Sequence, residues 1–269
     1  MNHGTTLLRS LLPPLAVRWL RRWRGRTSRF HGNFTTWAEA RQASTGYDST
    51  LILERVLAAT REVQAGRAAF ERDSVRFAQP ETNYPVLAGL LHAAARHGGK
   101  LAVADFGGSL GSVYWQHRRW FDSLAMVRWS VVEQPHFVAA GRRELADARL
   151  GFYLSLAECV ARDQPTVLLL SSVLSYLEAP QTLLDEAIRT GFDHILLDRT
   201  PCLDRTHDRL TVQRVPPAIY PASYPCWLFA RSSLLQPLAR DYRLIDEWLC
   251  PGETDGIAFR GFWFERAAR

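Results

Sequence analysis

The sequence predicts an α/β fold: a doubly wound sheet of seven strands, mostly parallel with an antiparallel C-terminal strand, preceded by an N-terminal helical cap. From Leu101 onward, short apolar runs alternate with segments of helical periodicity, a pattern typical of parallel strands joined by helices. The first run ends in an acid and a glycine-rich turn, Asp105-Phe-Gly-Gly-Ser-Leu-Gly111, just before a segment compatible with a helix. Ligands bind beside such turns in open α/β sheets, so this stretch is predicted to organise the functional site.

Residues 1–30 are predicted to form a basic amphipathic tail. They contain seven arginines and no acid up to residue 29, and the leucines and tryptophans between Leu15 and Trp23 share one helical face. A helix of this kind can lie on an anionic membrane surface; a loosely docked tail without a membrane role is the alternative. Arginines and prolines interrupt the apolar stretch of residues 5–24, so neither a membrane span nor a signal peptide is expected.

The charge and cysteine content exclude several classes of function. The seven tail arginines account for the formal net charge of +6, since the rest of the chain has 26 basic and 27 acidic residues, and no nucleic-acid surface is predicted. The four cysteines are scattered, without a C-x-x-C or a paired histidine spacing, so no metal site and no disulfide framework is expected. We therefore expect a cytoplasmic protein, with the tail as a route to peripheral contact with the inner membrane.

The helical cap is predicted over residues 31–83. Capping residues in Asn33-Phe-Thr-Thr-Trp-Ala-Glu-Ala40 precede a first helix, Gly46 interrupts it, and a second helix is predicted over Ser49–Gly66. The main domain, residues 84–269, opens with a helix over Tyr84–His97.

The strands of the main domain are predicted from its short apolar runs. Residues 200–227, rich in proline and tyrosine, are predicted to form a long ordered connection, and Ser232–Arg240 a helix. The last two predicted strands alternate in polarity and form an antiparallel pair. The seven strands are expected at Leu101–Phe106, Arg128–Glu133, Leu150–Tyr153, Thr166–Ser171, His194–Asp198, Tyr242–Leu249 and Ile257–Glu265.

The glycine-rich turn favours one kind of ligand. From Gly107, the spacing lacks the third glycine of a nicotinamide-dinucleotide fingerprint, and no G-K-[ST] follows, which excludes a phosphate-binding P-loop. The turn approximates D-x-G-x-G-x-G, with Gly108 as an additional glycine, Ser109 at the middle glycine position and Gly111 at the last. Glycines allow close backbone approach, and Asp105 can accept hydrogen bonds from an ammonium group, so the pattern suits a ligand with a cationic amino-acid end. A turn needed only for packing is the alternative.

Polar residues at the ends of three later strands add to this site. Glu133 follows Asp105 by 28 positions, about one strand–helix–strand unit, and can accept both hydroxyls of a ribose. Ser171 and Ser172 supply hydroxyls over the same crevice, or a helix N-cap. Asp198 is a candidate general base and Arg199 a candidate anion-binding group; a salt bridge between the two is the alternative. His207 is a second candidate base.

The chain also contains a set of longer motifs that carry a family resemblance. They span most of residues 31–265 and comprise Gly32–Ala40, Ser44–Asp48, Phe70–Val75, Asp105–Gln116, Val132–Gln134, Ser171–Leu177, Asp198–Pro201 and Ala222–Trp227. At these residues the chain resembles class I S-adenosylmethionine-dependent methyltransferases. More closely, it is similar to a methyltransferase family associated with bacterial surface-polysaccharide and lipopolysaccharide biosynthesis.

The resemblance implies a Rossmann-like domain, S-adenosylmethionine as cofactor and methyl transfer to an oxygen or nitrogen of a small or glycan-related acceptor. It implies cofactor contacts at Asp105, Gly107, Gly108, Gly111 and Glu133, with Ser109, Gln134, Ser171 and Ser172 beside them. Candidate acceptor-binding residues are Tyr47, Asp48, Asp73, Tyr114, Arg199, Tyr220, Tyr224 and Trp227.

Two other functional classes compete with the enzyme. One is a non-catalytic binding or scaffold protein that keeps the fold within a glycan-assembly complex. The other is a dinucleotide oxidoreductase, which lacks its fingerprint here. The sequence gives neither the acceptor nor the oligomeric state.

Overall fold

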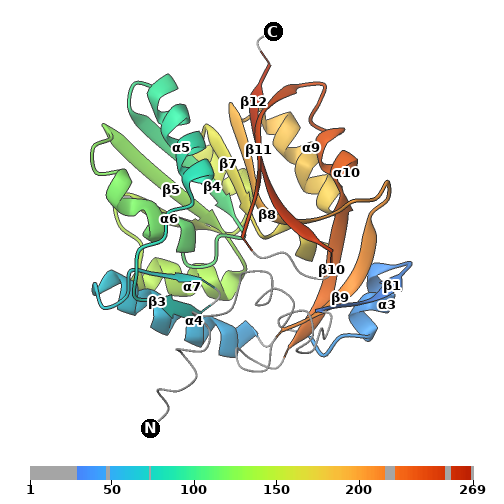
Figure 1. Ribbon diagram of the computed structural model, residues 1–269. Helices are drawn as coiled ribbons and strands as arrows, with labels where there is room; N and C mark the ends of the chain where they lie inside the picture. The colour runs from blue at the N-terminus through green and yellow to red at the C-terminus, as the bar shows by residue number, and fades with distance from the viewer. Residues whose placement is uncertain (1–28, 47–48, 73, 216–221, 252–255, 268–269) are drawn as a thin grey trace, which may run out of the picture.

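A mixed sheet runs through the protein. The computed structural model describes residues 29–46, 49–72, 74–215, 222–251 and 256–267 (Figure 1). The strands of this sheet are β1 (Phe30–Phe34), β4 (Lys100–Phe106), β5 (Met126–Val132), β6 (Leu150–Tyr153), β7 (Val167–Ser171), β8 (His194–Leu203), β9 (Arg209–Arg214), β10 (Ser223–Ala230), β11 (Tyr242–Leu249) and β12 (Ala258–Arg266).

The strand order confirms the predicted fold class. It is β1-β9-β10-β8-β7-β4-β5-β6, and strands β4 to β8 run parallel to one another. Strand β12 pairs antiparallel with β8, and β11 pairs antiparallel with β12. All seven predicted strands are present. The protein therefore has a mixed α/β sheet of Rossmann-like form, mostly parallel and with an antiparallel C-terminal strand.

Helices cover both faces of the parallel strands because the strands are apolar on both sides. Leu196 of β8 packs in the cluster that contains α4 (Ser49–Gln64), α5 (Tyr84–Arg96), α6 (Ser112–His117) and α7 (Pro135–Glu144). Its neighbours Ile195 and Leu197 point the other way, into the cluster that contains α8 (Leu156–Asp163), α9 (Pro180–Thr190) and α10 (Arg231–Leu235). Figure 1 shows α4 to α7 on one side of the sheet and α9 and α10 on the other.

The prediction of a long connection over residues 200–227 is wrong. Strand β8 continues to Leu203, and β9 and β10 follow, so the sheet extends beyond β8. Strand β10 pairs antiparallel with β9 and, at its end, parallel with β8. Pro201 and Pro225 lie within strands, and these prolines concealed the strand pattern in the sequence.

The segment before Tyr84 is only partly helical. It contains α3 (Trp37–Gln42), with Thr36 and Glu39 in a reciprocal capping box, and α4. However, β1 joins the main sheet beside β9, and β2 (Phe70–Arg72) and β3 (Val75–Phe77) form a separate hairpin. The segment supplies strands because β1 finds its partner far along the chain, which the local pattern does not reveal.

One further sequence expectation, on a helix, is corrected. Another, on the N-terminal tail, concerns residues that the structure does not describe. The helix predicted at Ser232–Arg240 is shorter, since α10 ends at Leu235. The amphipathic tail lies outside the described residues. Among the helices that the structure describes, none is long and apolar enough to cross a membrane.

The chain reverses its direction of growth across the sheet at β4. From β4 it adds β5 and then β6 on one side, whereas β7 and β8 lie on the other. The helices that follow these two strands in the chain, α6 after β4 and α9 after β7, accordingly pack in the core clusters on opposite faces of the sheet. In doubly wound folds this switch point is where ligands bind, so the fold places the candidate site between the ends of β4, β5, β7 and β8.

Candidate functional site

The glycine-rich turn after β4 has the backbone that its sequence requires. Gly107 and Gly111 have φ values of 71° and 86°, in the left-handed region. A Cβ atom on Gly107 would lie 2.3 Å from Cγ2 of Val173, and one on Gly108 would lie 2.4 Å from the Asp105 carboxylate. Both glycines are thus needed for the turn to pack against the protein's own atoms, whether or not a ligand binds.

Ser109 occupies the position where the sequence departs from the glycine pattern. Its φ is 57°, so it holds the left-handed conformation that glycine adopts without strain. For a residue with a Cβ this costs about 1–2 kcal/mol. Gly111 then begins α6 as its N-terminal cap residue. The turn keeps the glycine-type backbone despite the substitution.

Asp105, the last acid before the turn, is completely buried. Its Oδ2 accepts a hydrogen bond from Nε1 of Trp129 at 2.9 Å. Its Oδ1 is buried and has no hydrogen-bond donor among the described residues. The pKa of Asp105 is raised to about 7, mainly by burial and in part by the nearby Glu133 carboxylate, while the hydrogen bond from Trp129 opposes the rise. A buried carboxylate oxygen without a donor is costly, so this atom is suited to a ligand that brings a donor, above all a cationic one.

Glu133, directly after β5, is connected to the same turn. Its Oε2 accepts a hydrogen bond from the backbone N–H of Gln134 at 2.6 Å, and the backbone N–H of Ser109 also donates to its carboxylate. Burial raises the pKa of Glu133, and these two backbone hydrogen bonds oppose that rise. Glu133 and Asp105 thus place two acidic groups at the ends of adjacent strands.

The end of β7 and the middle of β8, which lie side by side, form a polar cluster. Ser171 donates to Oδ2 of Asp198 at 2.9 Å, and Arg199 donates to the hydroxyls of Ser171 at 3.1 Å and Ser172 at 3.3 Å. Arg199 Nε also lies 3.6 Å from Oδ2 of Asp198. Ser172 and Arg199 have φ values of 59° and 48°, a strained conformation for non-glycine residues that persists only where surrounding contacts hold it. The short helix that follows has Val173 as its cap residue, without a side-chain cap.

Asp198 is held by a buried network that the sequence did not reveal. The side chain of Asn83, at the start of α5, donates to Oδ1 of Asp198 at 3.1 Å, and Cys250 lies 3.6 Å from the same oxygen. The Asn83 backbone N–H donates to Nε2 of His117 at 3.1 Å, while Nδ1 of His117 lies 2.9 Å from the carbonyl of Val113. These contacts assign the neutral tautomer with its proton on Nδ1, and burial lowers the pKa of His117. Both oxygens of Asp198 therefore have donors.

We predict that Asn83→Asp destabilises the protein more than Asn83→Ala. Both changes remove the donor to Asp198, but aspartate also places a second carboxylate beside it, although it caps a helix as well as asparagine does. We expect Asn83→Asp to lower the free energy of unfolding by about 3 kcal/mol. Urea denaturation of the two variants and the parent measures this. Equal or greater stability of Asn83→Asp than of Asn83→Ala would contradict the network.

Glu71 is a second buried acid beside the turn that sequence reasoning missed. It lies on β2 and is 1% exposed. The hydroxyl of Ser112, the first residue of α6, donates to its Oε1, and the backbone N–H of Ser74 donates to its Oε2 at 3.2 Å. It lies inside the motif Phe70–Val75, but the sequence did not reveal its contact with the turn, because its partner on α6 is distant in sequence.

The structure separates the residues expected to bind an acceptor. Tyr224 packs edge-on against Tyr176, with ring centroids 5.2 Å apart, and Trp227 stacks with Trp37 at 6.4 Å. Tyr114 instead packs in the core between α6 and the sheet, 5.8 Å from the ring of Trp129. Four candidates lie outside the described residues: Tyr47, Asp48, Asp73 and Tyr220.

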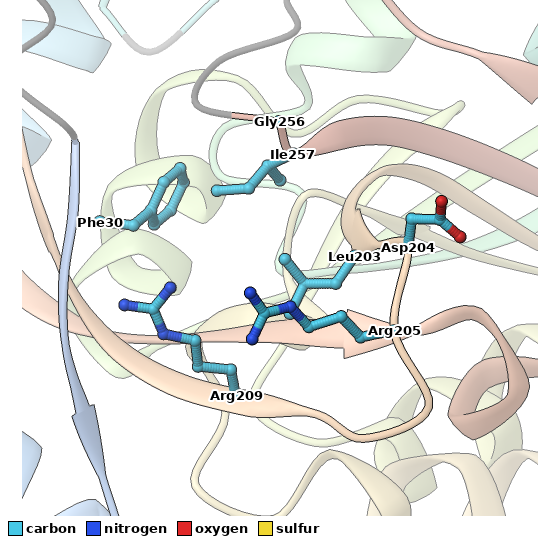
Figure 2. A pocket seen from close by; sticks show the side chains of 7 residues that line it. All are labelled: Phe30, Leu203, Asp204, Arg205, Arg209, Gly256 and Ile257. Atoms are coloured by element: carbon cyan, nitrogen blue, oxygen red, sulfur yellow. The ribbon is translucent and has the colours of Figure 1, made fainter.

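His207, the second candidate base, is on the exposed turn between β8 and β9. Its Nδ1 lies 2.8 Å from the hydroxyl of Thr206 in that same turn. Nearby is a surface cavity of about 280 Å³ lined by Phe30, Leu203, Asp204, Arg205, Arg209, Gly256 and Ile257 (Figure 2). None of the glycine-turn residues lines it. A second cavity, of about 320 Å³, lies along β6. The candidate site is thus defined by its polar groups and not by either cavity.

Comparison with known proteins places this chain near several solved methyltransferases. No protein-family model and no curated protein matches the sequence. A Burkholderia thailandensis 1,6-didemethyltoxoflavin-N1-methyltransferase, solved with 1,6-didemethyltoxoflavin and S-adenosylhomocysteine, is 14% identical with a TM-score of 0.43, covering 88% of this chain and 93% of its own. The glycopeptide N-methyltransferase MtfA with sinefungin is 16% identical with a TM-score of 0.45, covering 67% and 94%.

A third similar structure is an S-adenosylmethionine-dependent methyltransferase from Methanosarcina mazei. It is 10% identical with a TM-score of 0.49, and the match covers 70% of this chain and all of that one. With similarities of this size, the function of this chain has to be inferred from its own residues.

Proposed function

We propose that this protein is an S-adenosylmethionine-dependent methyltransferase that acts on an oxygen or nitrogen of a small or glycan-related acceptor. The observation that carries the proposal is the buried Oδ1 of Asp105, which has no donor among the described residues and lies at the switch point of the sheet. An ammonium group would supply the missing donor and the opposite charge in one contact.

The charges around the turn favour this cofactor over a phosphate-containing one. Asp105 and Glu133 place two acids at the turn, and both would repel a phosphate. The chain's only lysine, Lys100, lies at the other end of β4, so no lysine is available to the turn for phosphate binding. S-Adenosylmethionine suits the acids, because it carries an ammonium, a ribose and a sulfonium whose methyl group is the one transferred.

Each polar group then has a role in the proposal. Asp105 accepts from the ammonium, and the carboxylate of Glu133 accepts from the ribose hydroxyls. Arg199, held by Ser171 and Ser172, offers a cation to an anionic group of the cofactor or the acceptor. Asp198 already accepts hydrogen bonds on both oxygens, so we assign it to holding Ser171 and Arg199 in position. The gain in rate would come mainly from aligning the reacting atoms and excluding water.

A glycan-related acceptor, in surface-polysaccharide biosynthesis, is proposed from the resemblance of the sequence. The aromatic pairs Tyr176–Tyr224 and Trp37–Trp227 support it, since flat rings suit the apolar faces of sugars. The indole N–H of Trp227 is buried without an acceptor among the described residues, which leaves it able to donate to a bound molecule.

Calorimetry with S-adenosylmethionine tests the proposal. The intact protein is expected to bind one equivalent, and Glu133→Gln to bind at least about tenfold more weakly, because a charged hydrogen-bond acceptor contributes about 1.5–3 kcal/mol. Glu144→Gln is the matched control: Glu144 lies on α7 after the same strand, but its carboxylate pairs with Arg61 and Arg143. Absence of binding by the intact protein, or equal loss in both variants, would contradict the proposal.

A further inference from the structure

Two histidines and a glutamate meet at the edge of the sheet opposite the glycine turn. His194 is the first residue of β8, and Glu265 lies directly across from it in the antiparallel pairing with β12. His92 comes from α5, one turn after Gly89, whose backbone packs closely against Leu196 of β8. One potential ligand atom from each of the three residues lies within 4.8 Å of the other two.

One distance within this cluster is close to the distance between two ligands of a tetrahedral metal ion. Nε2 of His92 lies 3.6 Å from Oε1 of Glu265. Two ligand atoms that are each about 2.0–2.1 Å from a tetrahedral zinc ion lie roughly 3.3 Å apart, so a shift of a few tenths of an ångström brings this pair to ligating distance. The rings of His92 and His194 are perpendicular, with centroids 5.6 Å apart, so the two imidazoles do not stack on each other.

The protonation of His194 leaves a lone pair available. Nε1 of Trp263 donates to Nδ1 of His194 at 3.3 Å, so this nitrogen is an acceptor and carries no proton. His194 is 2% exposed, so its ring is fixed by the packing around it. The hydrogen bond is long, and a metal ion at Nδ1 would replace it.

The surroundings of the cluster give it access to solvent and hold the carboxylate of Glu265 in place. The side chain of His92 is 44% exposed and gives the cluster an opening to solvent. Oε2 of Glu265 accepts a hydrogen bond from Arg243 at 2.9 Å, which fixes the carboxylate, while Oε1 faces His92. His97, further along α5, pairs with Asp193 at 3.2 Å outside the cluster.

We propose that His92, His194 and Glu265 bind one divalent transition-metal ion, of which Zn²⁺ fits best. Two imidazole nitrogens and one carboxylate oxygen suit zinc and its neighbours, and they are poor ligands for Mg²⁺ or Ca²⁺. The ion connects α5 to β8 and β12 and leaves a fourth position open to solvent. The site lies at the amino end of β8, and therefore away from the proposed cofactor site at the carboxyl ends of the parallel strands.

The sequence expectation of no metal did not anticipate this cluster. The three residues are far apart along the chain and belong to different elements, so no ligand-spacing motif marks them. Only the pairing of β8 with β12 and the packing of α5 on β8 bring them together.

Cobalt titration of the full chain tests the site. After removal of metals with a chelator, Co²⁺ is expected to bind with one-to-one stoichiometry, to produce the visible absorption of a tetrahedral complex, and to be displaced by Zn²⁺. His92→Ala should weaken this binding at least about 100-fold, since even residues that only orient ligands change metal affinity 10- to 100-fold. His97→Ala is the matched control and should bind as the parent does. Absence of one-to-one binding by the parent, or equal binding by His92→Ala, would overturn the proposal.

A second pair of variants separates the ligand role of Glu265 from its ion pair. Glu265→Gln and Arg243→Ala both remove the contact between Arg243 and Glu265. Only Glu265→Gln removes the proposed ligand charge, so only it should weaken Co²⁺ binding, by about tenfold or more. An equal loss in the two variants would show that the carboxylate is not a ligand. Since neither readout involves S-adenosylmethionine, failure here would leave the proposed function unaffected.

Discussion

Asp105→Asn is expected to make the ligand-free protein more stable at alkaline pH and to weaken its binding of S-adenosylmethionine. Burial raises the pKa of Asp105 from 3.8 to about 7. The folded protein therefore retains a proton that the unfolded chain loses, and stability falls as the pH rises from the lower pKa to the higher one. The loss amounts to about 4 kcal/mol at most, and asparagine, which does not titrate, avoids it.

Urea denaturation at about pH 5 and about pH 8 measures this effect. The parent should lose stability relative to Asp105→Asn between the two values. Asp163→Asn is a control of opposite sign. Burial raises the pKa of Asp163, but hydrogen bonds from Ser130, Tyr153 and Arg128 together lower it, so this carboxylate stabilises the fold at neutral pH and its loss should be destabilising. Asp105→Asn that is no more stable than the parent at about pH 8 would contradict the burial of the Asp105 carboxylate.

The same variant separates stability from function. A residue that destabilises the ligand-free fold and improves binding is expected at a ligand site and not in a packing turn. Loss of S-adenosylmethionine binding together with a gain in stability would thus exclude the reading of the turn as packing alone. The expected loss is about 10- to 100-fold, the usual effect of removing a charged hydrogen-bond partner.

Gly107→Ala is expected to be among the most destabilising single changes in the turn. The added Cβ would lie 2.3 Å from Cγ2 of Val173, and the φ of 71° is unfavourable for alanine. Overpacking costs about 1–3 kcal/mol and the left-handed conformation about 1–2 kcal/mol, so we expect a loss of about 3 kcal/mol or more in the free energy of unfolding.

Gly98→Ala is the matched control for this change. Gly98 has a φ of 64°, and a Cβ there meets no atom within 4 Å, so it reports the conformational cost alone. Adding Val173→Ala to Gly107→Ala should restore part of the stability, and a double-mutant cycle measures the coupling. A Gly107→Ala variant as stable as Gly98→Ala would mean that the loops after β4 and β7 do not approach as the structure shows.

The parts of the fold that the sequence predicted are those with a local signal. Buried parallel strands are continuous apolar runs, as Val167–Leu170 shows, and the reversal after β4 is marked by glycines and an acid. Strands β9 and β10 lack such a signal, because Pro225 interrupts one of them and their partners include β1, which is distant in sequence. Their pairing is a property of the tertiary structure.

The candidate site also has a part that the sequence predicted and a part that it did not predict. Asp105, Glu133, Ser171 and Arg199 were identifiable because each ends a predicted strand at one edge of the sheet. The hydrogen-bond partners that determine the chemistry of these residues were not identifiable. Trp129 donates to one oxygen of Asp105 and leaves the other without a donor, and Asn83 donates to Asp198. These contacts depend on how helices and neighbouring strands pack, which sequence spacing does not specify. Because of these contacts, we assign Asp198 as a positioning group and not as a proton acceptor.

The most direct test of the proposed cofactor site is a crystal structure of the full chain with S-adenosylhomocysteine. It should show the ligand's ammonium group within hydrogen-bonding distance of Oδ1 of Asp105 and its ribose hydroxyls on the carboxylate of Glu133. Ligand bound elsewhere, for instance in the cavity lined by Arg205 and Arg209, with Oδ1 of Asp105 still lacking a donor, would contradict the proposal.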